Sequence, residues 1–145
     1  MIRRATLKDT AALIQLENAS FTTDIISSAS LRRLLKVESA EILVFEDENH
    51  IIGSLILLFR KNSKTARIYS LAVLQQHRRS GIAAHLYHAA EKSATKRSLE
   101  NIILEVHPDN HAALRFYEKN GFQTFGRYSH FYECGSDAIR MKKKL

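Results

Sequence analysis

The sequence predicts a single α/β domain over residues 1–145, with helices packed on a mixed central β-sheet. Its length fits one domain, and no repeat or linker rich in Gly, Ser or Pro divides it. The spacing of apolar residues switches repeatedly between the two-residue period of strands and the helical period near 3.6. A strand, a long helix and a second apolar strand follow one another, which is typical of a parallel crossover. The expected element order is β-α-α-β-β-β-α-β-α-β-β.

The first elements are a short strand and a capped helix. Residues 2–5 form the strand, and Thr6 then begins a helix that continues to about residue 20. Asp9 lies three residues after Thr6, which is the spacing of a capping box, in which a side chain satisfies a free backbone N–H of the first turn. Apolar residues at helical spacing predict that one face of this helix is buried.

A polar segment at residues 21–30 separates this helix from the next one. Ser28 or Ser30 is expected to cap a second helix over residues 31–37. Residues 41–46 and 51–60 are apolar strands joined by a polar turn, so they are expected to pair as an antiparallel hairpin.

The C-terminal half alternates strands and helices. Residues 66–73 form a strand, and residues 81–97 form an amphipathic helix whose inward face carries Ile82, Leu86 and three alanines. Residues 101–106 are expected to lie parallel to 66–73. Asn110 caps a helix that ends at Gly121, in the position that glycine favours after a helix. The last two strands are expected at 122–132 and 138–144, paired as a hairpin.

Composition and charge limit the classes of function. Hydrophobic residues make up 45% of the chain, which excludes collagen-like and disordered proteins. Lys and Arg number 22 against 15 Asp and Glu, a formal net charge of +7. This excess indicates a polyanionic partner, such as nucleic acid, a phosphate-rich cofactor or an RNA-containing complex. The alternative is a solvated surface with a basic tail at residues 142–144.

The cysteine content and the hydropathy of the chain indicate the cellular compartment in which the protein is expected. Cys134 is the single cysteine and can form no internal disulfide, which excludes a disulfide-rich secreted scaffold. The N-terminal residues lack the apolar core of a signal peptide, and no apolar run is long enough for a bilayer. We therefore expect a cytoplasmic protein with no membrane partner.

A loop that leads into the helix at residue 81 has the character of a phosphate-binding turn. Unpaired backbone N–H groups and the helix dipole make a helix N-terminus attractive to anions. Gly81 would allow close backbone approach, and Arg78 and Arg79 could contact phosphate oxygens. The motif is neither a P-loop nor a dinucleotide-binding fingerprint. Taken alone, it could also be an ordinary helix start with solvated arginines.

When this turn is taken together with the motifs before and after it, essentially the whole chain resembles the GNAT N-acetyltransferase superfamily. Within it, the sequence is most similar to ribosomal-protein-alanine N-acetyltransferases, although residues 21–26 lack the Trp often found there in that group. The runs that carry the resemblance are Leu71-Ala72-Val73, Arg78-Arg79-Ser80-Gly81-Ile82-Ala83, Leu104-Glu105-Val106, Asn110, Tyr117-Glu118-Lys119-Asn120-Gly121-Phe122, Phe131-Tyr132, Gly135-Ser136-Asp137-Ala138 and Met141.

The resemblance implies a GNAT fold whose two parallel strands splay apart at the cofactor site. It implies direct transfer of acetyl from acetyl-CoA to a primary amine in a ternary complex. The turn would hold the pyrophosphate, and a free strand edge would pair with the pantetheine arm. The residues so assigned to the cofactor are Leu71, Ala72, Val73, Arg78, Arg79, Ser80, Gly81, Ile82, Ala83, Ala84 and Asn110. Asn110 could equally be only a helix cap.

By the same resemblance, Glu105 is the general base, acting through water, and Tyr117 the general acid that protonates the departing thiolate. Glu105 could instead be a half-exposed strand carboxylate, and Tyr117 could only pack in the core. No metal is expected, since His85 and His88 have no carboxylate or thiol cluster beside them.

The expected acceptor is a protein N-terminal α-amine. The pKa of an α-amine is about 7.7–8.0, whereas that of the lysine side chain is about 10.4. An α-amine therefore loses its proton to a weak base more easily than lysine does. A small-molecule amine or a lysine remains the alternative acceptor. A different class of function is a non-catalytic basic module that docks on RNA or ribosomal particles. We expect no direct nucleic-acid contact, and a monomer or dimer.

Overall fold

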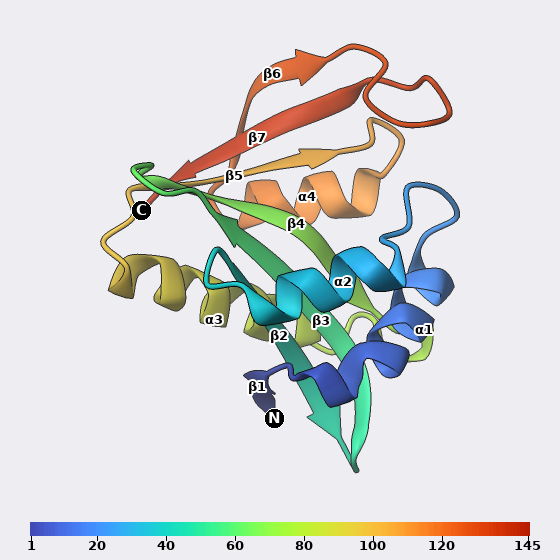
Figure 1. Ribbon diagram of the computed structural model, residues 1–145. Helices are drawn as coiled ribbons and strands as arrows, with labels where there is room; N and C mark the ends of the chain where they lie inside the picture. The colour runs from blue at the N-terminus through green and yellow to red at the C-terminus, as the bar shows by residue number, and fades with distance from the viewer.

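A seven-stranded mixed sheet forms the centre of the computed structural model, which describes residues 1–145 (Figure 1). The strands are β1 (Ile2–Arg4), β2 (Ala40–Asp47), β3 (His50–Phe59), β4 (Thr65–Val73), β5 (Asn101–Val106), β6 (Gln123–Tyr128) and β7 (Ala138–Lys144). The helices are α1 (Thr10–Ser20), α2 (Ser28–Lys36), α3 (Ile82–Lys96) and α4 (His111–Lys119), with the short 3-10 turns η1 (Leu7–Asp9) and η2 (Gln75–His77). The predicted order of helices and strands is confirmed.

The sheet has the spatial order β1-β2-β3-β4-β5-β7-β6, and only β4 and β5 are parallel neighbours. Their pairing confirms the predicted crossover. The hairpin of β6 and β7 is also confirmed, but β7 inserts between β5 and β6 and pairs with both. The strand predicted at 122–132 is too long, because β6 ends at Tyr128 and a loop follows.

The helix caps follow the predicted chemistry, with one correction. The capping box is present: the Thr6 N–H donates to Asp9 Oδ2 at 2.8 Å. The cap of α2 is Ser27, not Ser28 or Ser30. The Ser27 hydroxyl oxygen accepts a hydrogen bond from the Ser30 N–H at 3.1 Å. Ser27 has the extended backbone that a cap requires, so the helix begins one turn earlier than expected.

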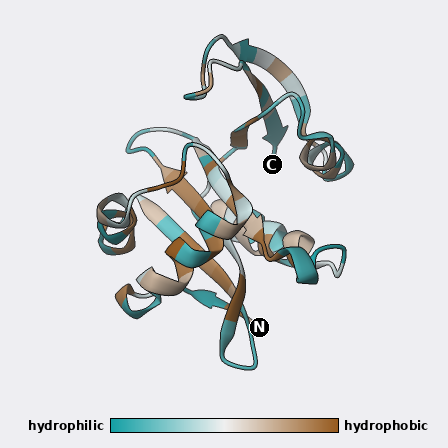
Figure 2. Cartoon of the chain, turned by 90° about the vertical axis from the view of Figure 1, so that its right-hand side faces the viewer, coloured by the Kyte–Doolittle hydropathy of each residue, from teal (hydrophilic) through white to brown (hydrophobic).

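Helices cover the two faces of the sheet unequally. On one face, α3 and α4 pack over a large core that includes the fully buried Tyr87. On the other face, α1 and α2 pack on β2, β3 and β4 around a smaller core. Figure 1 shows no helix over β5, β7 and β6 on that side, and Figure 2 shows hydrophobic stretches along the central strands. None of the helices has both the length and the apolar character needed to cross a bilayer.

A glycine sets the distance between α3 and the sheet. A Cβ added to Gly53 on β3 would lie 3.0 Å from Cγ2 of Ile82 and 3.1 Å from Cδ1 of Leu86. The missing side chain therefore lets the first turns of α3 rest closely on β3. This contact fixes the start of α3 beside the end of β4.

Candidate active site

The two parallel strands pair for only part of their length. Their register runs from Thr65 with Asn101 to Ile68 with Leu104, and then stops. On the other edge of β4, Leu57 pairs with Ile68 and Ile56 pairs with Ser70, so Tyr69 is the extra residue of a β-bulge. A bulge bends its strand, and this one lies where the parallel pairing ends.

The rest of β4 therefore has one paired and one open edge. Leu71, Ala72 and Val73 pair with β3 on one side and have no strand partner toward β5. Their free backbone groups could pair with an extended ligand as an added strand would. This is the edge that the family resemblance assigns to the pantetheine arm.

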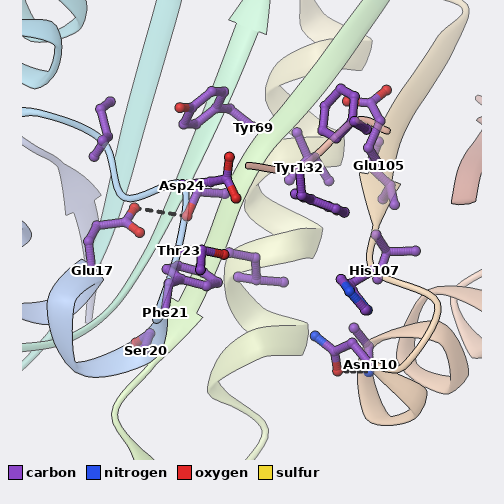
Figure 3. Close-up of a pocket in the computed structure, with 18 of the residues that line it drawn as sticks. Glu17, Ser20, Phe21, Thr23, Asp24, Tyr69, Glu105, His107, Asn110 and Tyr132 are labelled. Carbon is purple, nitrogen blue, oxygen red and sulfur yellow. Dashed lines mark hydrogen bonds between the residues drawn. The ribbon is translucent and has the colours of Figure 1, made fainter. Parts of the chain in front are cut away.

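A cavity of about 510 Å³ occupies the opening between the strands. It is lined by the end of α1 and the loop after it, by β4 and β5, by the start of α4, and by the loop between β6 and β7 (Figure 3). Glu105, Asn110 and Tyr117 all line it, so the structure brings together residues that lie on a strand, at a cap and on a helix.

The start of α3 has the geometry of an anion site. Gly81 adopts φ +83°, a left-handed conformation that favours glycine, and no side chain caps the helix. The first bond of the helix runs from the His85 N–H to the Gly81 carbonyl at 3.0 Å, so the preceding N–H groups have no partner within the helix. A Cβ at Gly81 would meet no atom within 4 Å, so the space in front is open.

The side chains of the turn divide into structural and available groups. Arg78 Nε donates to the Val73 carbonyl at 3.0 Å and ties the turn to β4, while the Ser80 hydroxyl donates to a carbonyl within the turn. The Ile82 side chain is buried in the core, so this residue can offer only its backbone N–H. Arg79 is exposed and forms no ion pair. Arg79 is therefore the side chain of the turn best placed to contact a phosphate. The small side chains of Ala83 and Ala84 leave the backbone of the first helical turn unobstructed.

Substitutions at this turn are expected to weaken acetyl-CoA binding. Gly81→Val strains a left-handed backbone, and Arg79→Glu places a carboxylate where phosphate oxygens should lie. Each should raise the Kd by about tenfold or more, which corresponds to about 1.4 kcal/mol. Isothermal titration measures the change, with Lys92→Glu on the outer side of α3 as the matched control. An unchanged Kd in both variants would place the pyrophosphate elsewhere.

Asn110 is a helix cap at the edge of the cavity. Its Oδ1 accepts a hydrogen bond from the Ala113 N–H at 3.1 Å, which satisfies the start of α4. Its side-chain NH₂ group forms no hydrogen bond within the protein, and the residue lines the cavity. The cap and a contact to a ligand are therefore compatible.

Glu105 projects between two arginines. Its Oε1 accepts a hydrogen bond from Arg67 Nε at 2.6 Å, and its Oε2 lies 3.8 Å from Arg140 Nε. The side chain is only 5% exposed. The ion pairs hold the carboxylate in place, and Oε2 keeps a free acceptor position for water. Burial raises the pKa of the neighbouring Tyr132 to about 12, with a smaller contribution from the negative charge of Glu105.

Tyr117 combines a packed ring with an unpartnered hydroxyl. The ring lies against Phe116 and Phe122, with centroids 5.3 and 5.4 Å away, and the residue is 7% exposed. No protein group forms a hydrogen bond with the hydroxyl. Burial raises its pKa above the ordinary value, so the hydroxyl keeps its proton at neutral pH. Both sequence interpretations, packing and proton donation, fit this position.

Glu17 on α1 is a cavity residue that was not predicted from the sequence. Its carboxylate accepts a hydrogen bond from the Ser70 hydroxyl at 2.8 Å, and the residue lines the cavity while only 3% exposed (Figure 3). Burial raises the pKa of Glu17 above its usual range. The signal was present in the sequence, because Glu17 lies one helical turn after the buried Leu13, on the apolar stripe of the helix.

Replacing Glu17 by Gln is expected to stabilise the protein at neutral pH. The folded state binds the Glu17 proton more tightly than the unfolded state, whose pKa is about 4.3, so Glu17 costs stability as the pH rises above that value. Gln removes the buried charge and can still accept from Ser70. The variant should melt above the parent at pH 7, and the difference should vanish near pH 4. Thermal unfolding across this range tests it, with exposed Glu118→Gln as control; a gain that does not depend on pH would contradict it.

No group of three or more His, Cys, Asp or Glu side chains is arranged to hold a metal ion. His85 and His88 lie exposed on α3. The features available for chemistry are therefore an anion-binding turn, an open strand edge and a cavity with a carboxylate and a tyrosine. Residues 10–122, which contain the anion-binding turn, the open strand edge, Glu105 and Tyr117, match the model of the Acetyltransferase (GNAT) family.

The chain belongs to the GNAT family. One relative is the N-alpha-acetyltransferase 30 of Schizosaccharomyces pombe, which is 34% identical over 97 residues, 65% of this chain and 65% of the relative. This GNAT chain spans between half and two thirds of the length of the first curated relatives that it matches.

Solved GNAT structures superpose on the whole chain. The ribosomal-protein-S18-alanine N-acetyltransferase of Escherichia coli has a TM-score of 0.89 at 21% identity, covering 100% of this chain and 93% of that one, which establishes the fold. The NatC complex bound to Gag peptide and CoA has a TM-score of 0.85 at 25% identity, covering 100% of this chain and 98% of that one. The sequence resemblance to the GNAT superfamily is thus confirmed, and the ribosomal-protein-alanine enzymes are among its structural neighbours.

Proposed function

We propose that this protein transfers the acetyl group of acetyl-CoA to the α-amine of a protein N-terminus. The observation that carries the proposal is the open edge of β4, which leads from the anion-binding start of α3 to the cavity with Glu105 and Tyr117. A phosphate-bearing, extended cofactor fits this path, and its reactive end would lie between a carboxylate and a phenol.

In the proposed reaction, the amine nitrogen attacks the thioester carbonyl carbon, a C–N bond forms, and the C–S bond breaks. The proton lost by the amine passes through water to Glu105, whose Oε2 has no hydrogen bond in the protein. The departing thiolate takes a proton from the Tyr117 hydroxyl. Burial raises the pKa of the Tyr117 hydroxyl, so this group holds the proton that it donates.

Two findings support an α-amine as acceptor. The relative from Schizosaccharomyces pombe is an N-alpha-acetyltransferase, and the NatC complex is bound to both Gag peptide and CoA. An α-amine with a pKa of about 7.7–8.0 also needs little help to lose its proton, whereas lysine at about 10.4 needs more. Within this class we propose an acceptor such as the N-terminal alanine of a ribosomal protein.

A panel of acceptors tests the proposal. Peptides with a free N-terminus, the same peptides blocked at the N-terminus but carrying lysine, and small amines are incubated with acetyl-CoA, and products are identified by mass spectrometry. Acetylation of the free α-amines alone is expected. Acetylation of lysine or small amines instead would change the acceptor class, and failure to bind acetyl-CoA would favour a non-catalytic docking module.

A further inference from the structure

A second hollow adjoins the cavity that holds Glu105 and Tyr117, and the proposed reaction does not use it. It measures about 930 Å³ and is lined by the end of β3, the turn after it and the start of β4, and by β5, β7 and β6 with the loop that joins the last two. Figure 1 shows that no helix covers β5, β7 and β6 on one face of the sheet. Arg67, Glu105 and Phe131 line both spaces. An extended chain whose first residue enters the cavity could therefore continue along this hollow, which we call the β-face groove.

The β-face groove is strongly basic. Its one carboxylate, Glu105, is already paired with Arg67 and lies close to Arg140. Two further cations, Arg60 and Lys142, take part in none of the ion pairs of the protein. The positive charge is thus not balanced within the groove.

Aromatic side chains form the far wall of the groove. Phe125, Tyr128 and Phe131 are 45%, 41% and 38% exposed, which is unusual for large apolar residues. The Arg140 guanidinium carbon lies 4.6 Å from the Phe125 ring centre and 4.1 Å from that of Tyr128. These rings hold Arg140 in place, and exposed aromatic and Arg side chains together are typical of recognition surfaces.

The neighbouring cavity has the opposite charge. The Glu105–Arg67 ion pair is shared with the groove, and beyond it the cavity is lined by two carboxylates, Glu17 and Asp24, and by no Lys or Arg. A cationic α-ammonium group suits the acidic cavity, and carboxylates placed after it suit the basic groove. An N-terminal peptide offers this order of charges when acidic residues follow its first residue.

We infer that the β-face groove binds the acceptor at the residues after its first one and selects acidic side chains there. An extended chain advances about 3.3–3.6 Å per residue, so positions two to four are the ones that would lie along the groove. This inference rests on the proposed function. It narrows the substrate to protein N-termini in which Asp or Glu follows the acetylated residue.

Three peptides that differ only in charge provide the test: Ala-Asp-Glu-Asp, Ala-Asn-Gln-Asn and Ala-Lys-Arg-Lys, each followed by the same neutral segment. We expect kcat/KM to be at least tenfold higher for the acidic peptide than for the neutral one, and lowest for the basic one. The preference should weaken as salt rises, since the groove is open to solvent.

Charge-reversal substitutions in the β-face groove test whether its cations cause the preference for the acidic peptide. Lys142→Glu and Arg60→Glu should each remove most of the preference for the acidic peptide over the neutral one. Lys92→Glu, which makes the same change of charge on α3, should keep the preference. A preference that survives both groove variants would overturn the inference.

The remaining outcomes separate this inference from the proposed function. Equal rates for all three peptides would overturn the selection of acidic residues and leave N-terminal acetylation intact. Acetylation of none of them, with acetyl-CoA still bound, would overturn both. Equal peptide rates together with binding of a uridine oligonucleotide that depends on Arg60 and Lys142 would make the groove an RNA surface and would also overturn the inference.

Discussion

Replacing Tyr117 by Phe is expected to lower kcat by about 10²–10⁴, the usual contribution of a positioned general acid. This range corresponds to about 2.7–5.4 kcal/mol of activation free energy. The substitution removes one oxygen and keeps the ring against Phe116 and Phe122. Because the hydroxyl forms no hydrogen bond within the protein, its loss leaves no protein group unpaired, and stability should change little.

Steady-state kinetics and acetyl-CoA titration of the variant measure this effect. The Kd should stay close to that of the parent, since negative charge develops on sulfur only as the C–S bond breaks. Tyr87→Phe is the matched control, because Tyr87 is also buried in the core but its hydroxyl donates to Glu91 at 2.5 Å and it does not line the cavity. Turnover within a few-fold of the parent would mean that water protonates the thiolate.

Replacing Glu105 by Gln is expected to reduce kcat by up to about 10²–10⁴ at low pH, where the acceptor amine is protonated. The defect should shrink as the pH approaches the amine pKa of about 7.7–8.0, because the amine then loses its proton without a base. The Gln side chain can still accept the Arg67 hydrogen bond, so the local geometry is conserved. The pH–rate profile of acetyl transfer to one peptide is the measurement.

The ion pairs of Glu105 require a control of their own. If Glu105 serves only to hold Arg67, then Arg67→Gln should reproduce the kinetic defect of Glu105→Gln at every pH. If Glu105 is the base, the Arg67 variant should lack the steep loss at low pH. A Glu105→Gln profile parallel to that of the parent would assign Glu105 a purely structural role.

The parts of the fold that local signals determine were predictable from the sequence. A capping box at Thr6 and Asp9, a cap at Asn110 and a left-handed Gly121 mark helix ends through chemistry within a few residues. Ser27 was missed because three serines lie close together in this segment, and only the backbone shows which one caps the helix.

The site was predictable in its residue types but not in its contacts. The bulge at Tyr69 depends on the register between β3 and β4, which no local pattern encodes. The arginines beside Glu105 come from β4 and β7, which become its neighbours only through the order of strands in the sheet. The basic groove has the same origin, since its charges are scattered along the sequence and gather on one face of the folded sheet.

The insertion of β7 between β5 and β6 has a consequence for biosynthesis. The hairpins of β2, β3 and β4 join segments close in sequence, but Asn101 at the start of β5 pairs with Lys144 at the end of β7. At about 5–20 residues per second, a ribosome needs a few seconds to make the intervening chain. During that time β5 has an open edge and apolar side chains without their final cover, which invites aggregation. Substitutions at the fully buried Met141 of β7 would therefore lower the yield of folded protein as well as its stability.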